Sequence, residues 1–296
     1  DSMTLNLKKE NFVIKKGMWK GEKLWDLYDR AKTPYSWHKE LFKYSKKQKI
    51  TCFSTPFDIE AVNFLERLKC PFYKISSFEM NDLPLIKRVA ETKKPIILST
   101  GTSNLKEITK TVNYLKSLKV KKFSIMYCVS NYPANIEDFN LNNIKILKKK
   151  FKCRVGLSDH SIDNTVAIAA ASAGAELFEK HICTKVSKTS PDFKFSLIDD
   201  QISKYRENID NVFKLLKRNK FHRNSSENLY KKFRRSIYCI RDIDKGEKFT
   251  ENNIKLLRPV NGLGPEYFYK VINKKSPNKI KFGTAITQKI FKKINS

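Results

Sequence analysis

Two histidines stand at equivalent places in the sequence, and they are the residues whose spacing points most directly to chemistry. His160 follows the apolar run 154–158, and His181 ends the run 175–181. Both runs are predicted strands joined by a helix, so both imidazoles should lie at the carboxyl edge of one α/β sheet. Two converging imidazoles can share a divalent metal. The alternative is that each histidine is a structural residue, and the spacing alone leaves both interpretations open.

The elements that must position these histidines recur along the chain. Apolar runs predict six strands, at 50–54, 72–76, 95–100, 123–128, 154–158 and 175–181. Helices are predicted at 37–47, 58–68, 83–91, 103–118, 141–151, 166–171 and 199–216. Ser103 or Asn104 can cap the fourth helix, and Gly174 can end the sixth in a left-handed conformation. A strand followed by a helix every ~20 to 30 residues is typical of a barrel of βα units.

A closed (β/α)8 barrel needs two strands more than the six predicted. Nothing after His181 supplies them, because the chain continues as helix, polar stretch and then a region of different character. We therefore expect an N-terminally truncated TIM barrel over residues 1–217, without its first two strands. Residues 218–232 are predicted to be a linker. Residues 233–296 have short apolar runs separated by glycine turns, which predicts a small β-rich domain.

The formal net charge of +30 requires a nucleic-acid partner to be considered. Lysine is spread along the whole chain, without an arginine-rich tract or a recognition motif. We therefore interpret the charge as a compositional bias, with anionic small substrates as a secondary explanation, and expect no nucleic-acid partner.

The remaining composition indicates a folded protein without a membrane partner. No apolar run approaches the ~20 residues that span a bilayer, and no signal peptide is visible in residues 1–5. The six cysteines lack the paired spacing of a metal site and are predicted to be free thiols: Cys52, Cys70, Cys128, Cys153, Cys183 and Cys239. These features predict a cytoplasmic location.

Several separated motifs occur in the order of one known family. They are Tyr73–Glu79, Ser99–Gly101, Gly156–Ser161 and Glu179–His181. Together they resemble the nonulosonate (sialic acid) synthases, and residues 233–296 resemble the antifreeze-like SAF domain of that family. Further motifs are similar to one branch of it: 1–5, 33–38, 192–196 and 233–236. The resemblance extends over essentially the whole chain.

The resemblance implies a reaction and a cofactor. The family condenses phosphoenolpyruvate with the open-chain aldehyde of an acetamido sugar, which releases phosphate and makes a nine-carbon α-keto acid. It implies that His160 and His181 bind a divalent metal, Mn²⁺ or Mg²⁺. A Lewis acid at that place suits the polarisation of an aldehyde oxygen.

The resemblance also implies roles for individual residues. Catalysis would involve Glu79, as the proton-transfer carboxylate, with Lys74 and the two histidines. The phosphoenolpyruvate-binding residues would be Thr55, Lys74, Ser77, Ser99, Tyr132 and Ser158. The sugar-binding residues would be Asp192, Arg258 and Glu179. Read without the resemblance, Asp159 caps the next helix, Glu179 orients a metal ligand, and Lys74 and Arg258 are exposed bases.

Assembly is a further implication, because in the family the SAF domain covers the active site of a partner subunit. We therefore expect a domain-swapped homodimer in which Arg258 reaches the sugar. After His181, Lys185 and Val186 depart from the family pattern of an aspartate followed by a basic residue, so part of the substrate contact should differ from that of the family. A truncated, non-catalytic relic and a metal-dependent aldolase of the same fold are the alternative functions, although an aldolase leaves the SAF-like region unexplained.

Overall fold

The computed structural model describes residues 3–294, so part of the opening motif at 1–5 lies outside the described residues. The chain divides into two compact units, residues 1–217 and 218–296. Each unit has its own buried core, and each is described by itself.

The first unit is built on a parallel sheet whose strands follow one another in chain order. The strands are β1 (Tyr73–Ile75), β2 (Ile96–Ser99), β3 (Phe123–Cys128), β4 (Arg154–Asp159) and β5 (Phe178–Lys180). Each pairs in parallel with the next. An order without reversal matches a curled, barrel-like sheet and differs from a doubly wound sheet, whose order reverses at a switch point. An α/β fold is thereby confirmed, whereas the eight-stranded barrel stays a prediction.

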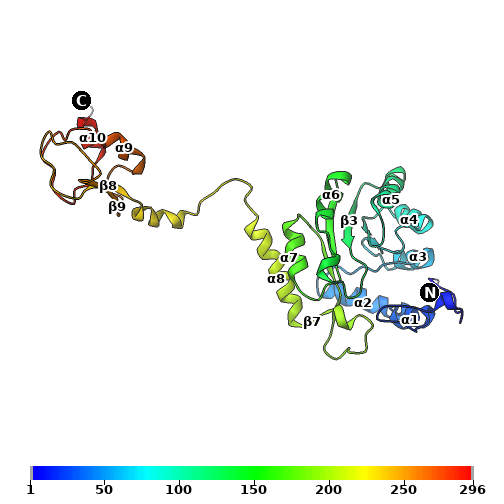
Figure 1. The fold of residues 1–296 in the computed structure, drawn as a ribbon. Coiled ribbons are helices and arrows are strands. Elements are labelled where there is room, and N and C mark those ends of the chain that lie inside the picture. Colours follow the sequence, from blue (N-terminus) through cyan, green and yellow to red (C-terminus); the bar gives the residue numbers. More distant parts are fainter. Residues whose placement is uncertain (1–2, 295–296) are drawn as a thin grey trace. The chain divides into compact units, whose positions relative to one another are not determined.

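Helices connect these strands and pack beside the sheet (Figure 1). The helices of this unit are α1 (Leu24–Ala31), α2 (Tyr35–Lys47), α3 (Ile59–Arg67), α4 (Leu83–Glu91), α5 (Leu105–Ser117), α6 (Asn142–Phe151), α7 (Thr165–Ser172) and α8 (Asp200–Leu215). Short 3₁₀ turns are η1 (Glu10–Phe12), η2 (Ile136–Asp138) and η3 (Phe193–Phe195). Asn104 caps α5 by accepting from two backbone N–H groups, and Gly174 follows α7 at φ +99°, as predicted. Among the described residues, no helix has the length and apolarity to cross a bilayer.

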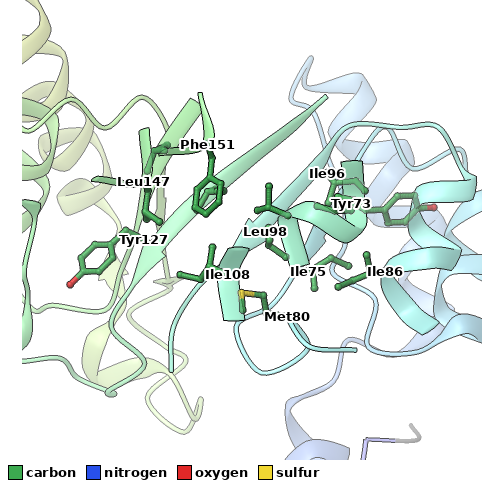
Figure 2. Close-up of a cluster of buried hydrophobic side chains, with 14 of the residues drawn as sticks. Tyr73, Ile75, Met80, Ile86, Ile96, Leu98, Ile108, Tyr127, Leu147 and Phe151 are labelled. Carbon is green, nitrogen blue, oxygen red and sulfur yellow. The ribbon is translucent and has the colours of Figure 1, made fainter. Parts of the chain in front are cut away.

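The main core lies between the sheet and its helices (Figure 2). Strand residues such as Tyr73, Ile75 and Leu98 are fully buried, as are Leu65 of α3 and Ile86 of α4. Burial of a large apolar side chain contributes about 1.5–3 kcal/mol. This packing fixes the strands relative to one another, and with them the residues at their carboxyl ends.

Two predicted strands differ from the structure. Residues 50–54 form no strand, and their backbone is not paired with β1. The segment is held by side-chain packing instead, with the ring centroid of Phe53 4.2 Å from that of Phe72. The predicted strand 175–181 is shorter in the structure, where β5 begins at Phe178 and ends at Lys180. After His181, β6 (Ile182–Cys183) pairs with β7 (Leu197–Ile198) in a separate two-stranded sheet, which the sequence analysis had not predicted.

The second unit is a small domain with a core of its own around Ile237, Phe249 and Ile254. Its antiparallel strands are β8 (Ser236–Cys239) and β9 (Ile254–Leu257), and isolated bridges add further pairing. Its helices are α9 (Phe268–Val271) and α10 (Gln288–Ile294), with 3₁₀ turns η4 (Ser225–Phe233) and η5 (Pro265–Tyr267). The η4 turn occupies much of the stretch predicted as a linker. All six cysteines of the chain are free thiols, as predicted.

Candidate active site

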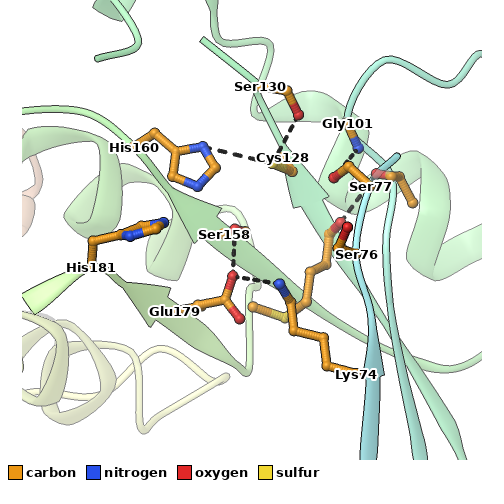
Figure 3. Close-up of polar contacts among 12 residues, drawn as sticks. Lys74, Ser76, Ser77, Gly101, Cys128, Ser130, Ser158, His160, Glu179 and His181 are labelled. Carbon is orange, nitrogen blue, oxygen red and sulfur yellow. Dashed lines mark hydrogen bonds and ion pairs between the residues drawn. The ribbon is translucent and has the colours of Figure 1, made fainter. Parts of the chain in front are cut away.

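The two histidines come together where β4 and β5 end (Figure 3). Asp159 and Lys180 are register partners at the end of the ladder, so His160 and His181 follow at matched positions. The centroids of the two imidazoles are 5.3 Å apart. This short separation results from the register of two adjacent parallel strands.

Each imidazole is held through its Nδ1 atom. His160 Nδ1 lies 2.8 Å from the carbonyl oxygen of Val129, and His181 Nδ1 lies 3.0 Å from Asp192 Oδ2. When Nδ1 donates to such an oxygen, Nε2 is left as the nitrogen that can bind a metal. Two imidazoles oriented in this way fit a divalent transition metal such as Mn²⁺, which accepts nitrogen and oxygen donors together. In the described part of the chain, no group of three or more His, Cys, Asp or Glu side chains forms a metal cluster.

A lysine and a carboxylate lie beside the histidines on the same side of the sheet. Lys74 Nζ is 3.1 Å from Glu179 Oε1, and the Ser158 hydroxyl donates to the same oxygen at 2.7 Å. Burial opposes ionisation of Glu179, but the charge of Lys74 and the bond from Ser158 outweigh it and lower the pKa of Glu179. The Glu179 carboxylate is thereby favoured in its charged form, and the pair presents an ammonium and a carboxylate side by side to a polar ligand.

Small residues that end or follow β1 and β2 bring hydroxyl and backbone N–H groups close together. The Gly101 N–H donates to Ser77 Oγ at 3.0 Å. A Cβ atom on Gly101 would lie 2.0 Å from Ser130 Oγ, so only glycine fits there. Ser99 Oγ is the one buried side-chain oxygen or nitrogen in the described residues that has no hydrogen-bond partner. A buried orphan hydroxyl is costly, which makes Ser99 a natural partner for a ligand oxygen.

Glu79 lies in the turn that follows β1. Its carboxylate accepts a short hydrogen bond from the Ser76 hydroxyl. Burial raises the pKa of Glu79 above the ordinary glutamate value, more than its hydrogen bonds lower it. A carboxylate with a raised pKa is suited to proton transfer near neutral pH.

Aromatic rings enclose the two histidines. The Tyr132 ring centroid is 4.3 Å from that of His160, and the Phe195 centroid is 4.9 Å from that of His181. Burial raises the pKa of Tyr132 to about 12, so its hydroxyl stays neutral and able to donate. The sequence analysis did not select Phe195, because η3 approaches the site only through the tertiary fold.

The other predicted site residues occupy different surroundings. Thr55 is half-buried after the irregular segment 50–54, and among the described residues its side chain joins no hydrogen bond of this network. Asp192 holds His181, so its predicted role as a sugar ligand stays a prediction. Arg258 belongs to the second unit, where it lines a hollow of about 690 Å³ together with Arg234, Arg235 and Glu266.

Two residues near the histidines have properties that the sequence analysis missed. Cys128 Sγ lies 3.8 Å from His160 Nδ1, and its place at the end of the predicted strand 123–128 was the available signal. The prediction that Asp159 caps the next helix is wrong. Asp159 is fully buried, and the backbone N–H of Thr165 at the start of α7 donates to Asp163 instead.

Comparison with known proteins defines the class to which this fold and site belong. Residues 1–221 match the NeuB family, and residues 234–291 match the SAF domain. The chain is a member of the NeuB family.

Individual proteins similar to this chain allow a finer comparison than the family as a whole. The chain is 41% identical to the pseudaminic acid synthase of Campylobacter jejuni, over 97% of this chain and 84% of that protein. It is 39% identical to the pseudaminic acid synthase of Helicobacter pylori, over 96% of this chain and 84% of that protein. Among solved structures, the N-acetylneuraminic acid synthetase of Leptospira borgpetersenii is similar with a TM-score of 0.65 and 30% identity, covering 69% of this chain and 72% of that one.

Proposed function

We propose that this chain is a synthase that condenses phosphoenolpyruvate with an open-chain 2,4-diacetamido-2,4,6-trideoxy hexose. The products would be a nine-carbon nonulosonic acid and inorganic phosphate. The observation that carries the proposal is the gathering of four side chains: His160 and His181 follow the neighbouring strands β4 and β5, and Lys74 of β1 reaches Glu179 of β5. The chain is also similar to pseudaminic acid synthases over nearly its whole length. Identity to the N,N'-diacetyllegionaminic acid synthase of Campylobacter jejuni is lower, at 35% over 80% of this chain.

The site offers both a charged and several neutral donors to the carboxylate and phosphate oxygens of phosphoenolpyruvate. The Lys74 ammonium is a point charge suited to an anionic oxygen. The Ser77 and Ser99 hydroxyls and nearby backbone N–H groups provide neutral donors for the remaining oxygens. The lone Ser99 hydroxyl supports this assignment, since a ligand oxygen would satisfy it.

The bond changes follow from the substrates. C3 of phosphoenolpyruvate bonds to the aldehyde carbon as the C2=C3 and aldehyde C=O π bonds break, and a water oxygen adds at C2. Of the two water protons, one ends on the former aldehyde oxygen, which becomes a hydroxyl, and one on the phosphate as the bond between C2 and the phosphate oxygen breaks. Phosphate leaves with the bonding electrons, and a carbonyl remains at C2. Glu79, with its raised pKa, would move a proton that the added water releases.

His160 and His181 would hold the divalent metal, Mn²⁺ or Mg²⁺. The support is their common orientation, with Nδ1 engaged on both rings. When bound, the ion would supply Lewis acidity toward an oxygen of the substrate. The buried ring of Phe195 and the half-buried ring of Tyr132 would exclude bulk water from this place.

The second unit would complete the site in a homodimer located in the cytoplasm. Arg258 would donate to the acetamido group of the sugar from the partner subunit. Mixing His160→Ala with Arg258→Ala protein tests this, because each mixed dimer has one intact site. Recovery of activity supports the swapped arrangement, and absence of recovery after confirmed subunit exchange contradicts it.

The acceptor sugar is tested by competition. The 2,4-diacetamido-2,4,6-trideoxy hexose of altro configuration and N-acetylmannosamine are supplied together with phosphoenolpyruvate. We expect kcat/KM to be at least about tenfold higher for the diacetamido sugar, because a site with buried polar groups rejects analogues that leave those groups unpaired. A preference for N-acetylmannosamine would identify the N-acetylneuraminate branch, and a second competition between the altro sugar and the legionaminate precursor tests the legionaminate branch in the same way.

A further inference from the structure

We propose that the buried ion pair between Asp159 and Lys180 sets the spacing of His160 and His181. The pair lies on the opposite face of the strands from the histidines and touches neither imidazole. Both residues would therefore act as positioning residues for the site. The inference rests on the proposed function only in the use that it gives to the two histidines.

Side-chain alternation along β4 and β5 places the ion pair on the face of the sheet opposite to the site. Ser158 and Glu179 are register partners on the side of Lys74, and the next pair along the ladder is Asp159 and Lys180. Successive strand residues face opposite sides, so this second pair faces away from Lys74 and toward α8. There Tyr205 of α8 donates its hydroxyl to Asp159 Oδ2 at 3.0 Å.

The backbone ladder ends just before the histidines. The Asp159–Lys180 pair is the last in register between β4 and β5. Beyond it, the His160 carbonyl accepts from the Ala134 N–H at 3.0 Å, and the His181 carbonyl accepts from the Leu197 N–H at 2.8 Å. The two strands thus turn to different partners at the histidines, and the last link between them is the pair directly beneath.

The side chains of this pair hold the backbone of Ser161, the residue that follows His160. Asp159 Oδ1 accepts from the Ser161 N–H at 2.8 Å and from the Ser161 hydroxyl at 2.6 Å. Lys180 reaches across from β5, with Nζ 3.2 Å from Asp159 Oδ2 and a short hydrogen bond to the Ser161 carbonyl. A residue that adjoins His181 is thereby tied to both neighbours of His160.

Burial of these charges distinguishes the pair from an ordinary surface salt bridge. The side chains of Lys180 and Asp159 are 5% and 0% exposed. Apolar residues of similar size often serve stability as well as a buried ion pair does. An apolar pair would lack the directional hydrogen bonds to Ser161 and Tyr205. These bonds fix the positions of Asp159 and Lys180 relative to each other.

The chain provides a matched control at the other end of the sheet. Glu66 also accepts from a lysine and a tyrosine, with Lys94 Nζ at 2.5 Å and the Tyr73 hydroxyl at 2.6 Å. Tyr73 begins β1 and Lys94 precedes β2, so this triad lies at the amino ends of the strands. Glu66→Gln removes a comparable charge without approaching the histidines.

The test compares Asp159→Asn with Glu66→Gln by two measurements on the full chain without substrate. The first is the nuclear Overhauser effect between the ring protons of His160 and His181 in metal-free protein, which reports their separation directly. The second is the affinity for Mn²⁺, followed by electron paramagnetic resonance. In Asp159→Asn we expect the inter-ring effect to be lost and Mn²⁺ affinity to fall about 10- to 100-fold. In Glu66→Gln we expect both to stay at the wild-type level.

A double variant separates positioning from stability. Asp159→Asn combined with Lys180→Met removes both charges, so it avoids an unpaired buried ammonium and should fold even where the single variant does not. We expect it to regain thermal stability but neither the inter-ring effect nor the Mn²⁺ affinity. Wild-type values of both measurements in either variant would overturn the proposal.

The two hypotheses fail in different ways. If wild-type protein binds no Mn²⁺, the metal assignment under the proposed function is wrong, and the inter-ring effect in metal-free protein still decides the positioning role. If wild-type protein binds Mn²⁺ and the ring separation survives the loss of Asp159, the metal assignment stands and the positioning role is wrong.

Discussion

Two carboxylates of the first unit have the same kinds of partner at opposite ends of one sheet. Asp159 is bonded to Lys180 and Tyr205 at the carboxyl ends of the strands, and Glu66 is bonded to Lys94 and Tyr73 at the amino ends. The first triad is buried, whereas the side chains of Lys94 and Glu66 are 25% and 31% exposed. Burial lowers the pKa of Lys180 despite its partner Asp159, and it raises the pKa of both tyrosines.

The two triads differ in how much stability depends on keeping each ion pair intact. Breaking a buried ion pair costs about 3–5 kcal/mol because a charge is left without a partner, whereas an exposed pair contributes about 0.2–1 kcal/mol. Among the described residues, Asp159–Lys180 is the ion pair in which both side chains are at most 5% exposed, and it directly precedes the two histidines along β4 and β5.

The largest expected effect is the loss of either histidine at the carboxyl end. His160→Ala or His181→Ala should reduce kcat/KM by about 10³-fold or more, because under the proposed function each variant removes a ligand of the metal, which would contribute several kcal/mol to the transition state. Steady-state kinetics in chelator-treated buffer restored with Mn²⁺ measures this loss. His222→Ala, at an exposed position in the second unit, is the control and should keep wild-type turnover. Near-normal turnover in either site variant would show that the histidines do not share a metal.

A smaller effect is expected from the orphan hydroxyl of Ser99. Ser99→Ala should raise the KM for phosphoenolpyruvate about 10-fold, because a hydrogen bond to a charged group is worth about 1.5–3 kcal/mol. Its thermal stability should be unchanged or higher, since the variant removes a buried hydroxyl that has no partner in the free protein. Kinetics and a melting curve on the same sample measure both. A lower melting temperature with unchanged KM would mean that Ser99 is structural.

The smallest effect is expected at the amino end, where helices end on lysine in the left-handed region. Lys93 follows α4 at φ +59°, a conformation that costs non-glycine residues about 1 kcal/mol. Lys93→Gly should therefore stabilise the chain by about 0.5–1 kcal/mol without changing kcat/KM. Lys87→Gly, inside α4, should destabilise it by about 1 kcal/mol. Urea titrations measure both changes, and destabilisation by Lys93→Gly would contradict this account of the amino end.

Local signals in the sequence predicted most of the elements. The helix predicted at 83–91 is α4, and the strand predicted at 123–128 is β3, because apolar periodicity and caps are encoded within each segment. The prediction for 50–54 was wrong because an apolar run does not reveal whether its backbone will join a ladder.

Only those parts of the site that lie on elements adjacent in the chain could be predicted from the sequence. His160 and His181 could be selected because their strands are adjacent in the chain and in the sheet. The role of Asp159 could not be predicted, since its partner Tyr205 lies 46 residues away on a helix that packs against the sheet. An aspartate after a strand reads locally as a helix cap, and only the tertiary fold turns it toward α8.

The central claim is that the carboxyl end of this sheet condenses phosphoenolpyruvate with a sugar aldehyde. The most direct measurement is the release of inorganic phosphate from phosphoenolpyruvate in the presence of Mn²⁺, with and without the diacetamido hexose. We predict release that depends on the sugar, equals the amount of nine-carbon acid formed, is lost in His181→Ala and persists in Glu66→Gln. Release that does not require the sugar, or that survives in His181→Ala, would contradict the claim.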